Sequence, residues 1–234
     1  MCGRFALRSS FQQLKKEFSF QHYQTEFNEN LTWDSSYNIA PGQKVIVLVG
    51  DEGQKKLNFQ YFRWGLIPFW AKDQGIGNKL INARAETIDQ KPSFKHSFKH
   101  RRCAVIADGF YEWKKDRSGK KPYFIQMKDQ KPFGFAGVYD HWKTPQNEII
   151  DSCAIITTEP NDKIKKIHSR MPVILTKDQL LKWMVGDNKN PESLKSILKT
   201  FNQNDLEIYE VSSYVNSPSN NSEQCVKPVN NGDQ

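Results

Sequence analysis

The sequence has few cysteines and no long apolar run. Its four cysteines, at positions 2, 103, 153 and 225, are widely separated and include no Cys-x-x-Cys pair, so we expect neither a disulfide framework nor a zinc site. The most apolar stretch covers residues 45–49 and has only the length of a strand, which excludes a membrane-spanning helix. No secretory signal is recognisable near Met1. These absences predict a protein of the reducing cytoplasm that has no membrane partner.

Acidic residues are fewer than basic ones, and the difference is local. The chain has 34 Lys and Arg against 26 Asp and Glu, a formal net charge of +8. The imbalance is steepest between Lys91 and Lys121, where only Asp108, Glu112 and Asp116 are acidic. A basic band with neighbouring aromatic residues is typical of a surface that binds nucleic acid. On charge alone, a basic face that is merely solvated explains the band equally well.

The sequence does contain ample apolar and aromatic residues for a core. Of its 234 residues, 37% are hydrophobic and 12% are aromatic, which is typical of a folded globular protein and not of a disordered one. A chain of this length fits one large domain. We place that domain at residues 1–215 and interpret residues 216–234, which are rich in Asn and Ser, as a polar C-terminal tail.

Apolar periodicity predicts helices near both ends of the chain and strands between them. A first helix is predicted over 11–18, and the polar stretch 23–36 is interpreted as a loop. Two later helices follow the capping signals at Thr176 and at Asn190. Strands are predicted over 44–49, 57–64, 102–113, 122–127, 133–142, 148–158 and 205–215. This order favours an α+β fold, with a mostly antiparallel sheet in a barrel-like or sandwiched core and flanking helices.

A cysteine stands directly behind the initiator methionine in MCGRF. If Met1 is removed, the chain begins with Cys2, which then carries a free amine and a thiol on the same residue. Such a pair would make the terminus chemically reactive. The alternative is that Cys2 lies in a frayed terminus, as the first residues of many domains do.

Two short motifs carry side chains suited to binding and to proton transfer. INARAET, residues 81–87, places Asn82 two positions before Arg84, whose guanidinium suits a phosphate. A helix start with a surface arginine explains this triplet as well. GFYEWKK, residues 109–115, places Glu112 between aromatic residues, where desolvation would raise its pKa and suit it to proton transfer. A strand-edge glutamate that faces lysines is the alternative.

Two further motifs add candidates of the same kinds. IHSRMPVIL, residues 167–175, contains His168, which can exchange protons near neutral pH, and Arg170, which can hold an anion. A lone histidine is more often structural. WGLIPFW contributes Trp64 and Trp70, either as a stacking platform for unpaired bases or as part of the core.

A metal site is considered and rejected. His96, His100 and Cys103 have a spacing that places possible ligands on one face of a helix. The same stretch is crowded with lysine and arginine side chains, which would repel a cation. We therefore expect no metal there.

Seven motifs occur in order across nearly the whole chain. They are MCGRF, YNIAPGQ, WGLIPFWAKD, NARAET, RRCAVIADGFYEWKK, FAGVYDHW and IHSRMPVIL. The series resembles the SRAP family (SOS response-associated peptidase). The chain departs from the family at Ser169, a position that we associate with an acidic residue, and the change could alter how His168 is held.

The resemblance implies that the protein processes abasic sites. Members of the family bind single-stranded DNA that has lost a base and attach covalently through the N-terminal cysteine, here Cys2. The amine forms a Schiff base with the open-form sugar aldehyde, and the thiol then closes a thiazolidine ring. An α-amino group titrates at about 7.7 to 8.0, so part of it is nucleophilic near neutral pH. A self-processing peptidase step that removes Met1 is also implied.

The same resemblance assigns roles to individual residues. The catalytic residues would be Cys2, Asn82, Glu112 and His168, with Asn82 orienting the terminus and the sugar while Glu112 and His168 move protons. The DNA-binding residues would be Arg4, Trp64, Trp70, Arg84 and Arg170. We expect a monomer that binds abasic single-stranded DNA and uses no cofactor and no metal.

Two other functions fit part of the sequence. An N-terminal-nucleophile glutamine amidotransferase can also begin Met-Cys-Gly and use its terminal amine as the base for the thiolate. That enzyme class usually has an attached synthetase domain, for which this chain has no room. A non-catalytic single-stranded DNA-binding module would use the basic band and would leave Cys2 replaceable.

Overall fold

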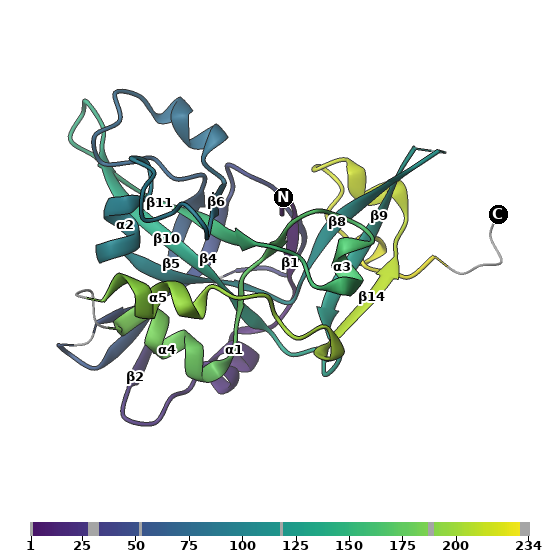
Figure 1. Cartoon of the computed structure of the whole chain (residues 1–234), viewed down its shortest axis with the longest axis horizontal. Coiled ribbons are helices and arrows are strands. Elements are labelled where there is room, and N and C mark those ends of the chain that lie inside the picture. The colour runs from purple at the N-terminus through teal and green to yellow at the C-terminus, as the bar shows by residue number, and fades with distance from the viewer. Residues whose placement is uncertain (1, 28–32, 52, 118, 187–189, 230–234) are drawn as a thin grey trace.

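A closed ring of five hydrogen-bonded strands forms the core of the larger part of the molecule (Figure 1). The computed structural model describes residues 2–27, 33–51, 53–117, 119–186 and 190–229. The ring runs β4–β5–β11–β10–β7 and back to β4, and only the pair β5–β11 is parallel. Its strands are β4 (Lys44–Asp51), β5 (Lys56–Trp64), β7 (Arg102–Ala107), β10 (Phe133–Lys143) and β11 (Ile149–Thr158). The expected barrel-like core of mostly antiparallel strands is confirmed.

The barrel strands are apolar enough to be covered on both faces. All six residues of β7 are buried, as are residues 45–49 of β4. Helix α4 (Lys177–Val185) packs against β7, and its fully buried Trp183 donates a hydrogen bond from the indole to the main-chain carbonyls of Cys103 and Gly137. Helix α5 (Pro191–Ile197) lies beside α4 on the same side of the barrel (Figure 1).

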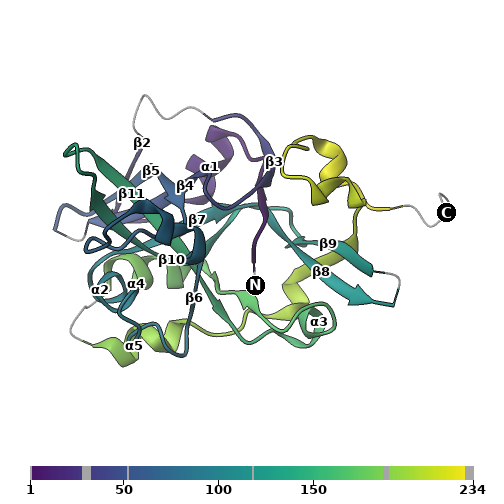
Figure 2. The same cartoon turned by 90° about the horizontal axis from the view of Figure 1, so that it is seen from above.

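A second, five-stranded antiparallel sheet lies beside the barrel. Its order is β14–β9–β8–β1–β3. The strands are β14 (Leu206–Glu210), β9 (Gly119–Met127), β8 (Gly109–Asp116), β1 (Phe5–Leu7) and β3 (Ser36–Ile39). Figures 1 and 2 show this sheet on the right of the barrel, with the β8–β9 hairpin reaching outward. Tyr111, Phe124 and Val215 belong to a small buried cluster on one face of this sheet.

The chain passes from one sheet to the other at Asp108. We expected one strand over 102–113, but β7 ends at Ala107 and β8 begins at Gly109. The carboxylate of Asp108 is buried and accepts hydrogen bonds from the amide of Arg8, the amide of Ser9 (2.7 Å) and the hydroxyl of Ser9 (2.5 Å). These three hydrogen bonds stabilise a buried charge that would otherwise destabilise the fold. The donors lie between β1 and the first helix, so that segment fixes the position of the break between β7 and β8.

The remaining elements are short. They are α1 (Phe11–Glu17), β2 (Gln24–Phe27), β6 (Asn82–Arg84), α2 (Lys95–His100), α3 (Asp162–Lys165), β12 (Met171–Pro172), β13 (Ile174–Leu175) and 3-10 turns at 74–79, 203–205, 213–216 and 223–225. Ser10 and Thr176 each form a capping box with the glutamine three residues on, and Asn190 caps α5. The three predicted helices are confirmed at these caps.

Two stretches differ from expectation. The predicted loop over 23–36 contains β2, which pairs in parallel with β5, and the start of β3; residues 28–32 lie outside the described residues. The last strand is shorter than predicted and covers only 206–210. Beyond it, within the described residues, Cys225 and Val226 are buried in the cluster of the second sheet. The boundary at residue 215 between domain and tail stays a prediction.

Candidate active site

The first residues of the chain lie between the barrel and the second sheet. Both views show the segment that leads into β1 between β6 and β8 (Figures 1 and 2). Cys2 is fully buried, and its main-chain carbonyl accepts a 2.7 Å hydrogen bond from the side-chain amide of Asn82. Asn82 is fixed because β6 pairs in parallel with β11, where it stands opposite Ile155.

The neighbouring residues hold this segment firmly. The amide of Tyr111 donates to the carbonyl of Arg4 (3.0 Å), and Phe5 stands opposite Phe110 in the sheet. The ring of Phe5 packs on the ring of Trp64, with centroids 5.1 Å apart. Burial and the nearby charge of Glu112 raise the pKa of the Cys2 thiol. The thiol is therefore protonated near neutral pH in this state.

Glu112 supplies a buried carboxyl group close to Cys2. It lies on β8 and is only 2% exposed. Burial raises its pKa to about 7. A carboxyl group that titrates at this pH can both donate and accept a proton under physiological conditions.

His168 lies next to this carboxyl group. Its Nδ1 is 3.8 Å from Oε2 of Glu112, and the main-chain amide of Arg170 donates a 3.1 Å hydrogen bond to the same Nδ1. The residue follows α3, and its own amide donates to the carbonyl of Ile164 at the end of that helix. Burial lowers the pKa of His168, so the neutral imidazole prevails at neutral pH.

These groups open into a pocket with a basic rim. The pocket has a volume of about 560 Å³ and is lined by Arg4, Glu112, Trp113, Lys115, Lys120, His168 and Asn216. A neighbouring pocket of about 550 Å³ is also lined by His168, together with Lys165 and Ser169. Histidine and glutamate inside a positively charged rim form a site that attracts an anionic substrate and can exchange protons with it.

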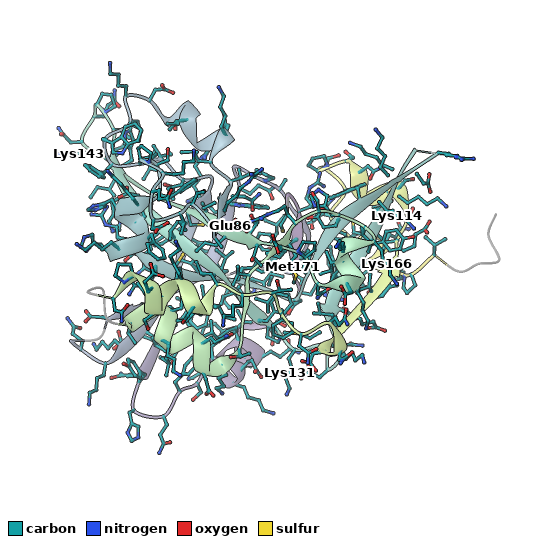
Figure 3. The ribbon with its side chains drawn as sticks, viewed as in Figure 1. Glu86, Lys114, Lys131, Lys143, Lys166 and Met171 are labelled. Carbon is teal, nitrogen blue, oxygen red and sulfur yellow. The ribbon has the colours of Figure 1, made fainter. Side chains whose placement is uncertain are left out.

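The β8–β9 hairpin beside the pocket carries paired lysines. Lys114 stands opposite Lys121, and Lys115 stands opposite Lys120. Like charges in directly opposed positions destabilise a hairpin, and the arrangement suits a bound polyanion. Figure 3 labels Lys114 on this hairpin and Lys166 after α3, on the same side of the molecule in this view. The basic band of the sequence thus divides between this hairpin and α2, which lies on the barrel.

The three predicted arginines differ in what they contact. Arg84 is exposed. Arg4 is half-buried: it donates to Oδ1 of Asn38 (2.6 Å) and to the carbonyl of Val215 (3.0 Å). Arg170 forms a two-pronged ion pair with Glu86, with Nη–Oε distances of 2.7 and 2.9 Å.

Of the two predicted tryptophans, one is exposed. Trp70 is 48% exposed and its neighbour Phe69 is 52% exposed. Trp64 is fully buried and donates from its indole to the carbonyl of Ile81 (3.0 Å). The expectation that Trp64 contacts DNA is therefore corrected: its ring is covered by core side chains, and it supports Phe5 from within the barrel.

Sequence reasoning did not single out three buried or paired residues that contact predicted site residues or their neighbours. Asn38 contacts Arg4, Glu86 pairs with Arg170, and Asp140 accepts a 2.9 Å hydrogen bond from the amide of Phe69. Each lies inside a motif quoted above, but the motif alone does not distinguish it from its neighbours. Their partners are 34 to 84 residues away in sequence, and for that reason their roles are visible only in the fold.

Two features of other protein classes do not occur in the part of the chain that is described. No group of three or more His, Cys, Asp or Glu side chains is arranged to hold a metal ion. None of the described helices is long and apolar enough to cross a membrane.

Comparison with known proteins identifies relatives that match nearly the whole chain. The family model for "SOS response associated peptidase (SRAP)" matches residues 1–218. Abasic site processing protein YoqW of Bacillus subtilis (strain 168) is 43% identical over 228 residues, which are 97% of this chain and 99% of the relative. Abasic site processing protein HMCES of Gallus gallus is 30% identical over 268 residues, 99% of this chain and 79% of the relative.

A solved structure supports the same relationship at the level of the fold. A protein from Bacteroides thetaiotaomicron, 27% identical in sequence, superposes with a TM-score of 0.85 and covers 97% of this chain and 100% of its own. The barrel and the second sheet are thus shared with a protein of known structure. The chain belongs to the SOS response associated peptidase (SRAP) family.

Proposed function

We propose that the protein processes abasic sites in single-stranded DNA by forming a covalent crosslink through Cys2. One observation carries the proposal. Cys2 is buried, is held at its carbonyl by Asn82, and lies within electrostatic reach of Glu112, whose charge adds to the effect of burial in raising the pKa of the thiol. A nucleophile fixed beside a carboxyl group of near-neutral pKa is suited to covalent chemistry assisted by proton transfer. The names of the relatives point to the same substrate.

The reaction begins when removal of Met1 places the α-amine on Cys2. The amine attacks the aldehyde carbon of the open abasic sugar and gives a carbinolamine, which loses water to form a Schiff base. The thiol sulfur then adds to the imine carbon, and its proton moves to the nitrogen, closing a five-membered thiazolidine. Aldehyde and aminothiol thus combine with the loss of one water, and no oxidant or reductant is needed.

Glu112 and His168 move protons in this sequence. Glu112 in its protonated form can donate to the departing oxygen, and as a carboxylate it can accept the thiol proton; a pKa of about 7 makes both forms available. Neutral His168 can accept or relay a proton in the same pocket. The same groups would assist removal of Met1 by the protein itself.

The basic surface around the pocket would hold the DNA backbone. Arg84 is exposed and free to meet a phosphate, and Lys115 and Lys120 line the pocket beside Arg4. Such contacts position a strand without reading its sequence. Trp70 offers an exposed ring on which an unpaired base can stack. Arg170 could reach a phosphate only if Glu86 released it.

The proposal is tested with two variants of the terminus and one control. Cys2→Ala keeps an amine but has no thiol, and an uncleavable residue inserted before Cys2 keeps the thiol but turns the amine into an unreactive amide. Cys225→Ala removes a buried thiol of the second sheet and serves as the control. Each protein is incubated with abasic single-stranded DNA and run on a denaturing gel, beside a binding measurement.

We expect both terminal variants to bind DNA normally and to give no heat-stable adduct, whereas Cys225→Ala gives the wild-type yield. A wild-type yield of heat-stable adduct from the extended protein would overturn the mechanism, because the α-amine would then not be the attacking group. Intact mass of the wild-type adduct adds a second check, since thiazolidine formation predicts the summed mass minus one water.

A further inference from the structure

The ion pair between Glu86 and Arg170 connects two parts of the site. Glu86 follows β6, the strand that carries Asn82, and Arg170 precedes β12. Their two Nη–Oε contacts are 2.7 and 2.9 Å, and Nη2 of Arg170 also donates to the carbonyl of Thr157 on β11 (2.6 Å). Figure 3 labels Glu86 and Met171 near the middle of the molecule. We call this set of contacts the Glu86 clamp.

The clamp fixes a backbone group that touches the imidazole of His168. The main-chain amide of Arg170 donates to Nδ1 of His168 at 3.1 Å. Bidentate pairs between guanidinium and carboxylate are rigid as well as strong. The side chain of Arg170 is only 15% exposed, and its guanidinium is held to β11 and to Glu86. Its own backbone is consequently held in one orientation, with the amide hydrogen directed at the ring.

That amide hydrogen decides which ring nitrogen of neutral His168 carries the proton. The carbonyl of Arg170 also lies 3.2 Å from Nδ1 and could accept a proton from it. The amide hydrogen cannot move, because the peptide plane fixes it, whereas the imidazole proton can reside on either nitrogen. The carboxylate of Glu112 also faces Nδ1, but its Oε2 is 3.8 Å away, which is beyond hydrogen-bond distance. The amide of Arg170 therefore meets the lone pair of Nδ1, and the proton is placed on Nε2.

We propose that Glu86 is a positioning residue that, through Arg170, holds His168 as the Nε2–H tautomer. Loss of the clamp would let the 168–170 segment relax, so that Nδ1–H could donate to the carbonyl of Arg170 and the tautomers would mix. The tautomer is a property of the free protein. Its consequence for the reaction rests on the proposed function, in which His168 moves protons.

A rival explanation gives Glu86 the opposite role. Its carboxylate could occupy Arg170 in place of a DNA phosphate, in which case removing its charge would strengthen DNA binding. The contact to Thr157 and the low exposure of Arg170 argue for the clamp, because the guanidinium is built into the fold on two sides.

The experiment compares Glu86→Gln with the matched control Glu26→Gln. Glu26 is also a half-exposed glutamate in one ion pair, with Lys56 at 2.8 Å, but it lies on β2 at the far end of the barrel sheet from the site. Ring nitrogen shifts of His168 are recorded by long-range proton–nitrogen NMR on the free proteins. Crosslinking rate at saturating abasic single-stranded DNA and dissociation constant for the same DNA are measured in parallel.

We expect the Nε2–H signature in the wild type and in Glu26→Gln, and a mixture of tautomers in Glu86→Gln. The crosslinking rate of Glu86→Gln should fall several-fold with little change in the dissociation constant. If Glu86→Gln does not fold, Arg170→Lys, which keeps the charge and loses the fork, takes its place with the same expectation.

Unchanged ring shifts in a folded Glu86→Gln protein would overturn the proposal, as would tighter DNA binding without a tautomer change. If Glu86→Gln changed the tautomer of His168 but the wild-type protein formed no crosslink, the role of the Glu86 clamp would be supported and the proposed function would be refuted. The double variant Glu86→Gln/Arg170→Gln should be no slower than Arg170→Gln alone, because the two residues act as one unit.

Discussion

The side-chain amide of Asn82 donates a 2.7 Å hydrogen bond to the main-chain carbonyl of Cys2, across 80 residues of sequence. This bond ties the start of the chain to the barrel, because Asn82 is itself paired to β11. The other polar atom of its side chain, Oδ1, is buried and has no hydrogen-bond partner among the described residues. Asn82 therefore holds Cys2 with its donor and leaves an acceptor available to a reacting group.

Replacing Asn82 should uncouple the terminus from the rest of the site. Asn82→Ala removes the donor, and Asn82→Asp places a carboxylate oxygen against the carbonyl of Cys2, where two acceptors repel. We expect both variants to crosslink abasic DNA more slowly, with Asn82→Asp the slower of the two. An unsatisfied buried partner costs about 1–3 kcal/mol, which corresponds to a fall in rate of roughly 5- to 160-fold when the whole cost is added to the reaction barrier.

The measurement is a time course of adduct formation at saturating DNA, with thermal unfolding as a check on the fold. Equal rates for wild type and Asn82→Asp would show that the contact to Cys2 has no part in the reaction.

The buried carboxyl of Glu112 should make stability depend on pH. Its pKa is raised by burial from 4.5 to about 7, so the folded protein binds this proton more tightly than the unfolded chain does. The stabilisation is fully present below pH 4.5 and is lost as pH rises through about 7. Glu112→Gln, which cannot ionise, avoids that loss. At pH 8 we expect the free energy of unfolding of Glu112→Gln to be on the order of 3 kcal/mol higher than that of the wild type.

Denaturant unfolding at pH 5 and pH 8 checks this expectation, with the exposed Glu148→Gln as the control. The difference between Glu112→Gln and wild type should grow from the lower pH to the higher one, while Glu148→Gln tracks the wild type. Crosslinking by Glu112→Gln should be slower at both, since proton transfer is lost. A difference in stability that does not vary with pH would contradict the raised pKa.

Strand prediction succeeded wherever a segment is long and its apolar pattern is regular. The strands β4, β5, β9, β10 and β11 belong to this class, and their burial is visible in their own residues. The strand β2 was missed because Gln24–Phe27 is mostly polar and becomes a strand by pairing with β5. The break at Asp108 was missed because its donors, Arg8 and Ser9, are about 100 residues away.

The residues of the candidate site divide in the same way, into those that a short motif reveals and those that only the fold reveals. Residue types with intrinsic chemistry, namely Cys2, Asn82, Glu112 and His168, can be nominated from short motifs and from a family resemblance. Supporting residues such as Glu86 cannot be nominated in this way, because the role of an exposed glutamate is visible only once its arginine partner is known. The prediction that Trp64 binds DNA was wrong for a related reason: its motif does not reveal that the ring is buried in the core.

Arg84 should contribute affinity without sequence preference. Each phosphate contact releases a counterion, so loss of one contact makes the dependence of binding on salt less steep by about one in the logarithmic slope. Arg84→Ala should weaken binding to several unrelated single strands by similar factors and show this smaller slope. Lys131→Ala removes the same charge from a side chain that is 59% exposed and, in Figure 3, lies at the lower edge, away from Glu86.

Binding measured by fluorescence anisotropy at four salt concentrations gives both slopes. We expect the Lys131→Ala slope to equal that of the wild type. If Arg84→Ala changed the preference for particular bases while overall affinity held, Arg84 would be reading sequence and the phosphate role would be refuted.

The buried side-chain amide of Asn38 is one of several groups that attach the segment from residue 213 onward to the site. Nδ2 of Asn38, which is 2% exposed, lies 3.1 Å from the carbonyl of Val215 and 2.7 Å from that of Asn220, and its Oδ1 accepts from Arg4. Asn216 in the same segment lines the pocket that contains Glu112. These contacts make the segment one wall of the site.

Asn38→Ala should therefore disturb both stability and the position of Arg4. It leaves buried carbonyls without their donor and removes one acceptor from the guanidinium of Arg4, which we expect to lower the free energy of unfolding by about 2–4 kcal/mol. Asn216→Ala is the graded control: it removes only the exposed hydrogen bond from the indole of Trp113 (2.8 Å) and should cost less than about 1 kcal/mol. Chemical denaturation gives both values, and limited proteolysis should cut the 213–229 segment of Asn38→Ala well before that of Asn216→Ala. If the two variants were equally stable and equally resistant, the amide of Asn38 would not be what holds this wall in place.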